Sequence, residues 1–264
     1  GCARNLVLLG DPQQLEQPSQ GSHPPGARAS ALGHLLNGTE TIRPDRGLFL
    51  DVTWRMHPDV CHYISENFYD SRLRSSPTTA GQRILGHDEL SGTGLRWMPV
   101  EHTGNRSASD QEASAVAELV VRLLGRWWID QDGIERPVTP ADILVVAPYN
   151  AHVAALRSSL VDDVAVGTVD RFQGQEAAVV IYSMATSLAE DVPRGMEFLY
   201  SRNRINVAVS RARCLAVLVC SPDLLRVSCT IAAQIPLANA LCSFIEHARP
   251  VDPAENHAAQ LVML

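Results

Sequence analysis

The sequence predicts an α/β protein in which helices cover both faces of a parallel β-sheet. Short apolar runs without polar alternation recur along the chain, which is typical of strands that are buried on both faces. Segments of helical length separate these runs, and their apolar residues recur at three- and four-residue spacing. This alternation of strands and helices favours a parallel sheet. With 264 residues, the chain is long enough to bury a full core without disulfide bonds.

The N-terminal elements are predicted from apolar runs and turn residues. Asn5–Leu9 is an apolar run that stops at a Gly-Asp-Pro turn, so it predicts a strand leading into a polar loop. Residues 17–44 are rich in Gly, Pro, Ser and His, and they predict a flexible connection with a short helix over Ala29–Leu36. A second strand is predicted at Leu48–Val52, followed by a helix over Asp59–Phe68.

The middle of the chain predicts a long amphipathic helix from about Ser109 to Trp127. Ser109 is a suitable N-cap because Glu112 lies three residues further on, as in a capping box. The apolar residues of this segment fall on one face. The other predicted strands are Leu95–Val100, Ile143–Ala147, Val164–Val169, Ala177–Met184 and Leu215–Cys220, and the other predicted helices are Ala151–Leu160, Arg202–Arg211 and Ile235–His247.

The composition excludes several classes of function. All 22 residues counted as Lys or Arg are arginines. The sequence therefore holds no lysine for Schiff-base chemistry, for pyridoxal phosphate or for a phosphate-binding loop of the GxxxxGK[ST] type. The net charge of −7 argues against non-specific coating of nucleic acid but leaves local basic grooves open. The apolar stretches are too short to span a bilayer, so we expect no membrane partner.

Cysteine and histidine spacing gives no sign of a metal framework. The six cysteines form no CxxC pair, which favours reduced thiols in a cytoplasmic protein over disulfides or a zinc site. His57, Cys61 and His62 lie close together in the sequence, but without further ligands they predict no metal site.

Four polar clusters lie at or near the carboxyl ends of predicted strands, where ligands bind in parallel α/β sheets. In chain order they read GDPQQL from Gly10, TWRMHP from Thr53, GTVDRFQGQE from Gly167 and RINVAVSRAR from Arg204. Their order and content resemble motifs III to VI of superfamily 1 helicases, most closely those of the Upf-like group. The resemblance spans Leu6 to about Ser221. The Thr53-Trp54 variant and the C-terminal tail are also similar to bacterial members fused to a RecB-like nuclease domain.

The resemblance implies a RecA-like domain that lacks its own P-loop. A superfamily 1 motor has two RecA-like domains with ATP between them, and the first supplies the P-loop lysine and the Asp-Glu pair that holds Mg²⁺. We therefore expect the Mg²⁺ ligands in an N-terminal domain that this sequence does not contain. The expected division is a last strand of the first RecA-like domain at residues 1–16, a connecting loop at 17–47, the second RecA-like domain at 48–250 and a C-terminal tail at 251–264.

The resemblance also implies which residues meet ATP. Arg55 and Arg211 match arginines that reach the nucleotide across the domain interface, where an arginine finger contributes about 10³–10⁵ in rate. Gln14 matches the glutamine that senses the γ-phosphate and positions water. Gly174 allows a close backbone approach, and Glu176 matches the residue on the ribose hydroxyl. We expect Gln14, Arg55 and Arg211 to be catalytic and all five residues to bind ATP.

Structural alternatives stay open for the two arginines. Arg55 could pair with Asp51 or Asp59, and Arg211 could cap a helix C-terminus.

The expected contacts with single-stranded DNA or RNA rest on two segments. Thr168 matches a motif V hydroxyl that meets the phosphate backbone in the family. Tyr149 and Asn150 lie in a segment that resembles the family's TPY-type motif. Asp170 and Arg213 could instead form an internal network between motifs V and VI.

The sequence thus predicts the C-terminal motor half of an ATP-dependent DNA or RNA helicase, inactive without the preceding RecA-like domain. One alternative is a truncated, non-enzymatic helicase module that binds nucleic acid or a partner protein. An unrelated Rossmann-like enzyme is disfavoured because no glycine-rich turn follows the first predicted strand.

Overall fold

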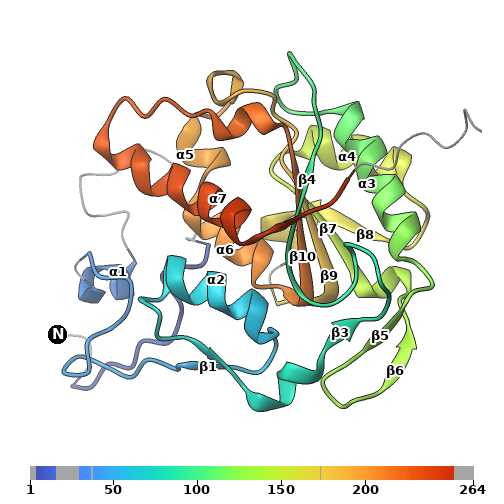
Figure 1. Ribbon diagram of the computed structural model, residues 1–264. Coiled ribbons are helices and arrows are strands. Elements are labelled where there is room, and N and C mark those ends of the chain that lie inside the picture. The colour runs from blue at the N-terminus through green and yellow to red at the C-terminus, as the bar shows by residue number, and fades with distance from the viewer. Residues whose placement is uncertain (1–3, 16–29, 37, 173, 253–264) are drawn as a thin grey trace, which may run out of the picture.

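A computed structural model describes residues 4–15, 30–36, 38–172 and 174–252 of the chain. At its centre lies a six-stranded sheet in the order β11-β4-β10-β9-β7-β8, and every neighbouring pair of strands is parallel (Figure 1). This sheet confirms the predicted α/β class. The strands are β4 (Gly94–Pro99), β7 (Ile143–Ala147), β8 (Ala165–Thr168), β9 (Ala177–Ser183), β10 (Ala212–Cys220) and β11 (Arg249–Pro250).

Helices cover both faces of the sheet (Figure 1). One face packs against α2 (Pro58–Phe68), α6 (Arg202–Val209) and α7 (Ile235–His247), and the other against α3 (Asp110–Leu123) and α4 (Asn150–Ser159). Every residue of β7 and β9 is buried, because alternate side chains enter the two cores. The shorter helices are α1 (Ala31–Leu36), α5 (Met196–Leu199) and 3₁₀ turns at Pro77–Gly81, Pro140–Asp142, Val169–Phe172, Ala189–Asp191, Pro222–Leu225 and Ala232–Gln234.

The long helix α3 begins as predicted but ends early. Ser109 is its N-cap, and its hydroxyl oxygen accepts a hydrogen bond from the Glu112 N–H at 3.1 Å. The helix ends at Leu123, because the chain turns at Gly125 with a φ of 78°. Extension of this helix to Trp127 was therefore a wrong expectation. The tryptophan pair instead opens β5 (Trp127–Ile129), the middle strand of an antiparallel sheet with β3 (Arg83–Ile84) and β6 (Glu135–Pro137).

Two predicted strands do not form. No strand is assigned over Asn5–Leu9, where the side chains of Leu6, Val7 and Leu9 are 76%, 80% and 90% exposed. At the second segment only β1 (Val52–Thr53) forms, paired in parallel with β2 (Arg74–Ser75). A strand needs a neighbour for its backbone hydrogen bonds, and within the described residues neither segment pairs with a strand of the central sheet.

The two ends of the predicted division are only partly described. Residues 17–29 of the expected connection and 253–264 of the expected tail lie outside the described residues. Val251 is fully buried and its N–H donates to the Trp97 carbonyl at 2.8 Å, so the sheet domain continues to this residue. None of the helices in the described part of the chain is long and apolar enough to cross a membrane.

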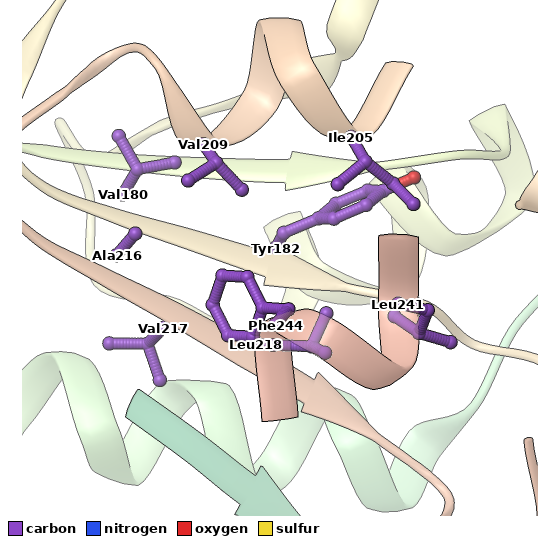
Figure 2. Close-up of a pocket in the computed structure, with 9 residues that line it drawn as sticks. All are labelled: Val180, Tyr182, Ile205, Val209, Ala216, Val217, Leu218, Leu241 and Phe244. Carbon is purple, nitrogen blue, oxygen red and sulfur yellow. The ribbon is translucent and has the colours of Figure 1, made fainter. Parts of the chain in front are cut away.

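An enclosed cavity lies between α6, α7 and the sheet, and Figure 2 shows the side chains that surround it. Tyr182 carries the only polar side-chain atom among the nine residues drawn there. The cavity measures about 10 Å³, room for about one water molecule, so it is a gap in core packing. A nucleotide does not fit in this cavity. We therefore expect the candidate site at the ends of the strands.

Candidate nucleotide site

Arg55 is held in place by the backbone around it. It lies between β1 and α2, and its carbonyl oxygen accepts a hydrogen bond from Gln82 Nε2 at 2.8 Å. Two residues later the His57 N–H donates to the Arg213 carbonyl at 2.7 Å, which ties the segment to the start of β10. The Arg55 side chain ion-pairs with Glu176 through Nε and donates from Nη1 to the Ser210 carbonyl at 3.1 Å. The alternative pairings of Arg55 are therefore not formed.

Arg211 is the second arginine of the site, and it is only 4% exposed. Its Nη1 donates to the Gln175 carbonyl at 2.8 Å, whereas its buried Nε has no hydrogen-bond partner among the described residues. Burial and the positive charge of Arg55 lower the pKa of Arg211 to about 10, so it remains charged at neutral pH. The alternative that Arg211 caps a helix C-terminus is not realised through this contact, because Gln175 lies in the turn before β9 and not at the end of a helix. A buried guanidinium with an unused donor is suited to an anion.

Glu176 bridges the arginines of two different segments. Its Oε2 pairs with Arg55, and its Oε1 accepts from Arg213 at 2.6 Å and 3.1 Å. Burial would raise the pKa of Glu176, but hydrogen bonds from Arg55 and Arg213 and their charges outweigh this and lower it. The single carboxylate therefore stays ionised between Arg55 and Arg213 and leaves the cluster of three arginines with surplus positive charge.

The cluster is assembled by the register of two strands. Glu176 immediately precedes β9 and Arg211 immediately precedes β10, where Ala177 and Ala212 are register partners. Both residues therefore lie at the amino ends of their strands. The expectation of a site at the carboxyl ends was wrong for these two residues. Gly174 precedes them with a φ of 84°, and no atom would contact a Cβ placed there, so the turn needs glycine for its backbone angle alone.

Gln14 lies apart from the arginine cluster, against α6. Its Nε2 donates to Asp11 Oδ2 at 2.8 Å, and its carbonyl oxygen accepts from Asn203 Nδ2. Asn206, one turn further along α6, donates to the Gln13 carbonyl at 2.9 Å. Within the described residues, no hydrogen bond or ion pair joins Gln14 to either arginine. The structure thus brings Arg55, Glu176 and Arg211 together but leaves Gln14 on a neighbouring face.

The residues expected to contact nucleic acid lie at the carboxyl ends of the strands, opposite the arginine cluster. Thr168 ends β8 and is the register partner of Ala147, the last residue of β7. Asn150 opens α4 just beyond that strand end and is exposed. Tyr149 is only 7% exposed, and its ring packs against Phe198 with 5.5 Å between centroids. Thr168 and Asn150 thus share an accessible edge, whereas the Tyr149 ring belongs to the core.

Asp170 and Arg213 take part in ion pairs between motifs V and VI. Asp170 pairs with Arg204 at 3.0 Å, while Arg213 pairs with Glu176. Both pairs join motif V to motif VI, so the predicted internal network between these motifs forms, although Asp170 and Arg213 each have a different partner. Arg204 also lies over the Phe198 ring, 4.5 Å from its centroid.

Comparison with known proteins identifies the family. A family model described as an AAA domain (AAA_12) matches residues 30–223, which is more than half of the chain. The chain belongs to this family. Together with the helicase relatives below, this confirms the resemblance to the Upf-like group of superfamily 1.

The helicase domain has curated relatives that are much longer. It is 28% identical over 244 residues to Helicase sen1 of Schizosaccharomyces pombe, a match that covers 85% of this chain and 13% of that protein. It is also 28% identical over 289 residues to the Regulator of nonsense transcripts 1 homolog of Arabidopsis thaliana, covering 97% of this chain and 20% of that protein. The chain thus spans about an eighth to a fifth of these relatives.

A solved structure described as the structure of PRRSV helicase is 18% identical and covers 81% of this chain and 29% of that chain, with a TM-score of 0.36. At this TM-score the similarity does not support the assignment of fold or function.

Some site residues of the helicase domain were missed from the sequence. The sequence did not predict the ion pair between Arg213 and Glu176. It also did not predict the hydrogen bonds from Asn203 and Asn206 to the backbone of the motif III segment. The three-residue spacing of the two asparagines puts them on one face of a helix and is the signal that could have found them. No sequence signal pairs Arg213 with Glu176, because their contact depends on strand register.

Proposed function

We propose that the chain is the C-terminal motor half of an ATP-dependent DNA or RNA helicase, and that Arg55 and Arg211 act on the ATP phosphates. The observation that carries this proposal is Arg211, a buried guanidinium with an unused Nε donor beside the positive charge of Arg55. Arg55 and Arg213 share the single carboxylate of Glu176, and Arg211 donates to the neighbouring Gln175 carbonyl, so the site favours a ligand with several negative charges. The phosphate chain of a nucleoside triphosphate has this chemistry.

In this proposal the chain supplies only part of the machinery. ATP with Mg²⁺ binds between two RecA-like domains, and the domain that holds the metal is a further part of the parent protein. Arg55 and Arg211 stabilise the charge that develops on the transferred phosphoryl group. Gln14 positions water, Gly174 lets the backbone approach the nucleotide, and Glu176 binds the ribose.

Exposed apolar residues support a neighbouring domain as partner. Leu6 and Leu9 are 76% and 90% exposed, and Leu48 and Leu50 are 92% and 84% exposed. Two extended apolar segments that no strand of the central sheet covers are the expected surface for burial against another domain. We retain the division into 1–16, 17–47, 48–250 and 251–264 as part of the proposal, with the last boundary moved past the buried Val251.

The nucleic-acid part of the proposal rests on the carboxyl edge of the sheet. Thr168 and Asn150 contact the backbone of single-stranded DNA or RNA there, and the buried Tyr149 ring supports this edge from below. A cytoplasmic location and a RecB-like nuclease domain in the parent stay predictions.

The arginine role is tested by Arg211→Ala in the intact parent protein, with Arg226→Ala as the matched control. The Arg226 side chain is 81% exposed, and its one ion pair among the described residues is with Asp223, three residues away. We expect Arg211→Ala to lower nucleic-acid-stimulated ATP turnover by at least about 10³-fold while ATP binding changes little. The control retains turnover. Equal turnover in the two variants would remove Arg211 from the phosphates.

The truncated, non-enzymatic module is favoured for the free chain by one observation, the absence of any lysine for a phosphate-binding loop in this sequence. We expect the purified 264-residue chain to hydrolyse essentially no ATP. Robust ATPase activity stimulated by nucleic acid would contradict both the division of labour and the module.

A further inference from the structure

His62, Glu66 and His247 meet on the outer surface of two neighbouring helices. Figure 1 shows α7 beside α2, and two hydrogen bonds join them, from Tyr63 Oη to the Ala240 carbonyl at 2.8 Å and from Asn67 Nδ2 to Ser243 Oγ at 3.0 Å. His62 and Glu66 lie one turn apart on α2, and His247 is the last residue of α7. The two histidines and the carboxylate therefore converge from helices that are already fixed relative to each other.

The three side chains surround a common point. Glu66 Oε1 lies 3.4 Å from His62 Nε2, and Glu66 Oε2 lies 3.3 Å from His247 Nε2. All three candidate ligand atoms lie within 4.8 Å of one another. These separations exceed the roughly 2.7–2.9 Å of a charge-assisted hydrogen bond. Ligand atoms around a tetrahedral zinc ion, at bonds of about 2.0–2.2 Å, lie about 3.3 Å apart.

The hydrogen bonding of His247 fixes which nitrogen faces the carboxylate. Its Nδ1 lies 2.8 Å from the Ser243 carbonyl oxygen, which can only accept, so Nδ1 carries a proton. In the neutral ring, Nε2 then directs a lone pair at the Glu66 oxygen. A cation at Nε2, either a proton or a metal ion, makes this 3.3 Å contact with the Glu66 oxygen attractive. A backbone carbonyl on the far nitrogen is also the usual outer partner of a metal-bound histidine.

We propose that His62, Glu66 and His247 bind one divalent transition-metal ion of the zinc class. Imidazole and carboxylate are ligands that zinc accepts, and three protein ligands leave a fourth position for water. The side chains are 61%, 41% and 34% exposed, so the two histidine rings can close by rotation without a change in the backbone. The ion links α7 to α2, the helix that begins three residues after Arg55. This site is independent of the proposed nucleotide chemistry.

The test measures zinc binding to the purified chain by isothermal titration calorimetry. It also measures the Tm of the chain with and without zinc. Cys2 and Cys229 are replaced by serine in every protein, because free thiols also bind zinc. The variants are Glu66→Gln, which keeps the side-chain shape, and His247→Gln. The matched control is His87→Gln, which removes an exposed histidine that is not part of the cluster. Cobalt is the spectroscopic probe of coordination number.

We expect one equivalent of zinc with a micromolar or tighter dissociation constant, a rise of several degrees in Tm at 100-fold excess over that constant, and intense visible bands with cobalt. Glu66→Gln and His247→Gln should each weaken binding at least tenfold and abolish the rise in Tm, while His87→Gln changes neither. Millimolar binding, or the same affinity in all variants, would overturn the proposal and leave only a surface ion pair between Glu66 and the two histidines.

Discussion

Glu112 is a fully buried carboxylate, and its replacement is expected to be among the most destabilising single changes in this domain. Its Oε2 accepts from Ser183 Oγ at 2.6 Å and from the Ala185 N–H at 2.9 Å, and its Oε1 lies 2.9 Å from His102 Nε2. Ser183 in turn contacts His152 Nε2 at 2.7 Å. The network joins α3 to the segment that follows β9, beside the carboxyl edge of the sheet.

The magnitude follows from what each substitution leaves behind. Glu112→Ala removes the acceptor of two buried donors and the partner of His102, and breaking a buried charged network in this way costs about 3–5 kcal/mol in the free energy of unfolding. Glu112→Gln keeps the shape but turns an amide N–H₂ toward one of the former donors. Leaving such a donor unsatisfied costs about 1–3 kcal/mol.

The assay is urea unfolding of the purified chain, with Glu118→Gln as control. Glu118 lies on the same helix but is exposed, so its substitution should change the free energy of unfolding by less than about 0.5 kcal/mol. Unchanged m-values in all variants show that the same surface is exposed on unfolding. If Glu112→Gln were as stable as Glu118→Gln, the buried carboxylate would not hold the two elements together.

Three further outcomes are expected for the isolated chain. Burial lowers the pKa of His152, and the charge of Glu112 only partly opposes this, so the unfolded chain binds a proton at a higher pH than the folded chain. The free energy of unfolding should therefore be fully present above about pH 6.5 and fall as the pH drops further. Urea unfolding at each pH should show a shallower fall for His152→Gln. Glu176→Gln removes the carboxylate that Arg55 and Arg213 share, and it should lower the free energy of unfolding by about 1–3 kcal/mol. Pyrophosphate should then raise the Tm of this variant more than that of the wild type. An equal rise in both proteins would contradict an anion site. Leu48→Ser with Leu50→Ser should change the free energy of unfolding by less than about 0.5 kcal/mol because both side chains are over four-fifths exposed, and a loss above 1 kcal/mol would show that they pack within the chain.

The sequence predicted those elements whose signals are local. Ser109 is an N-cap because its hydroxyl reaches an N–H three residues away, and α7 begins and ends at the predicted residues. The central strands were recognisable because burial on both faces requires continuous apolar runs. Asn5–Leu9 has the same composition, yet no strand is assigned there, since a strand also needs a neighbour that composition does not reveal.

The candidate site was predictable as a set of residues but not as a geometry. The resemblance to the helicase motifs pointed to Arg55, Glu176 and Arg211, and the structure brings these three together. The position of Glu176 and Arg211 at the amino ends of β9 and β10 was not predicted, because the rule for parallel sheets points to carboxyl ends. Tyr149 shows the opposite limit, since a tyrosine after a strand gives no sign of whether its ring faces a ligand or the core.

Strand register explains why three distant segments can place charges against one another. Ala177 and Ala212 are register partners, so the residues before them, Glu176 and Arg211, are set side by side by two long buried strands. The Arg213 carbonyl then accepts the His57 N–H, which fixes the segment that carries Arg55. Hydrogen bonds to the Ser210 and Gln175 carbonyls hold Arg55 and Arg211 in place, which is the arrangement that the proposed electrostatic stabilisation of a transition state requires.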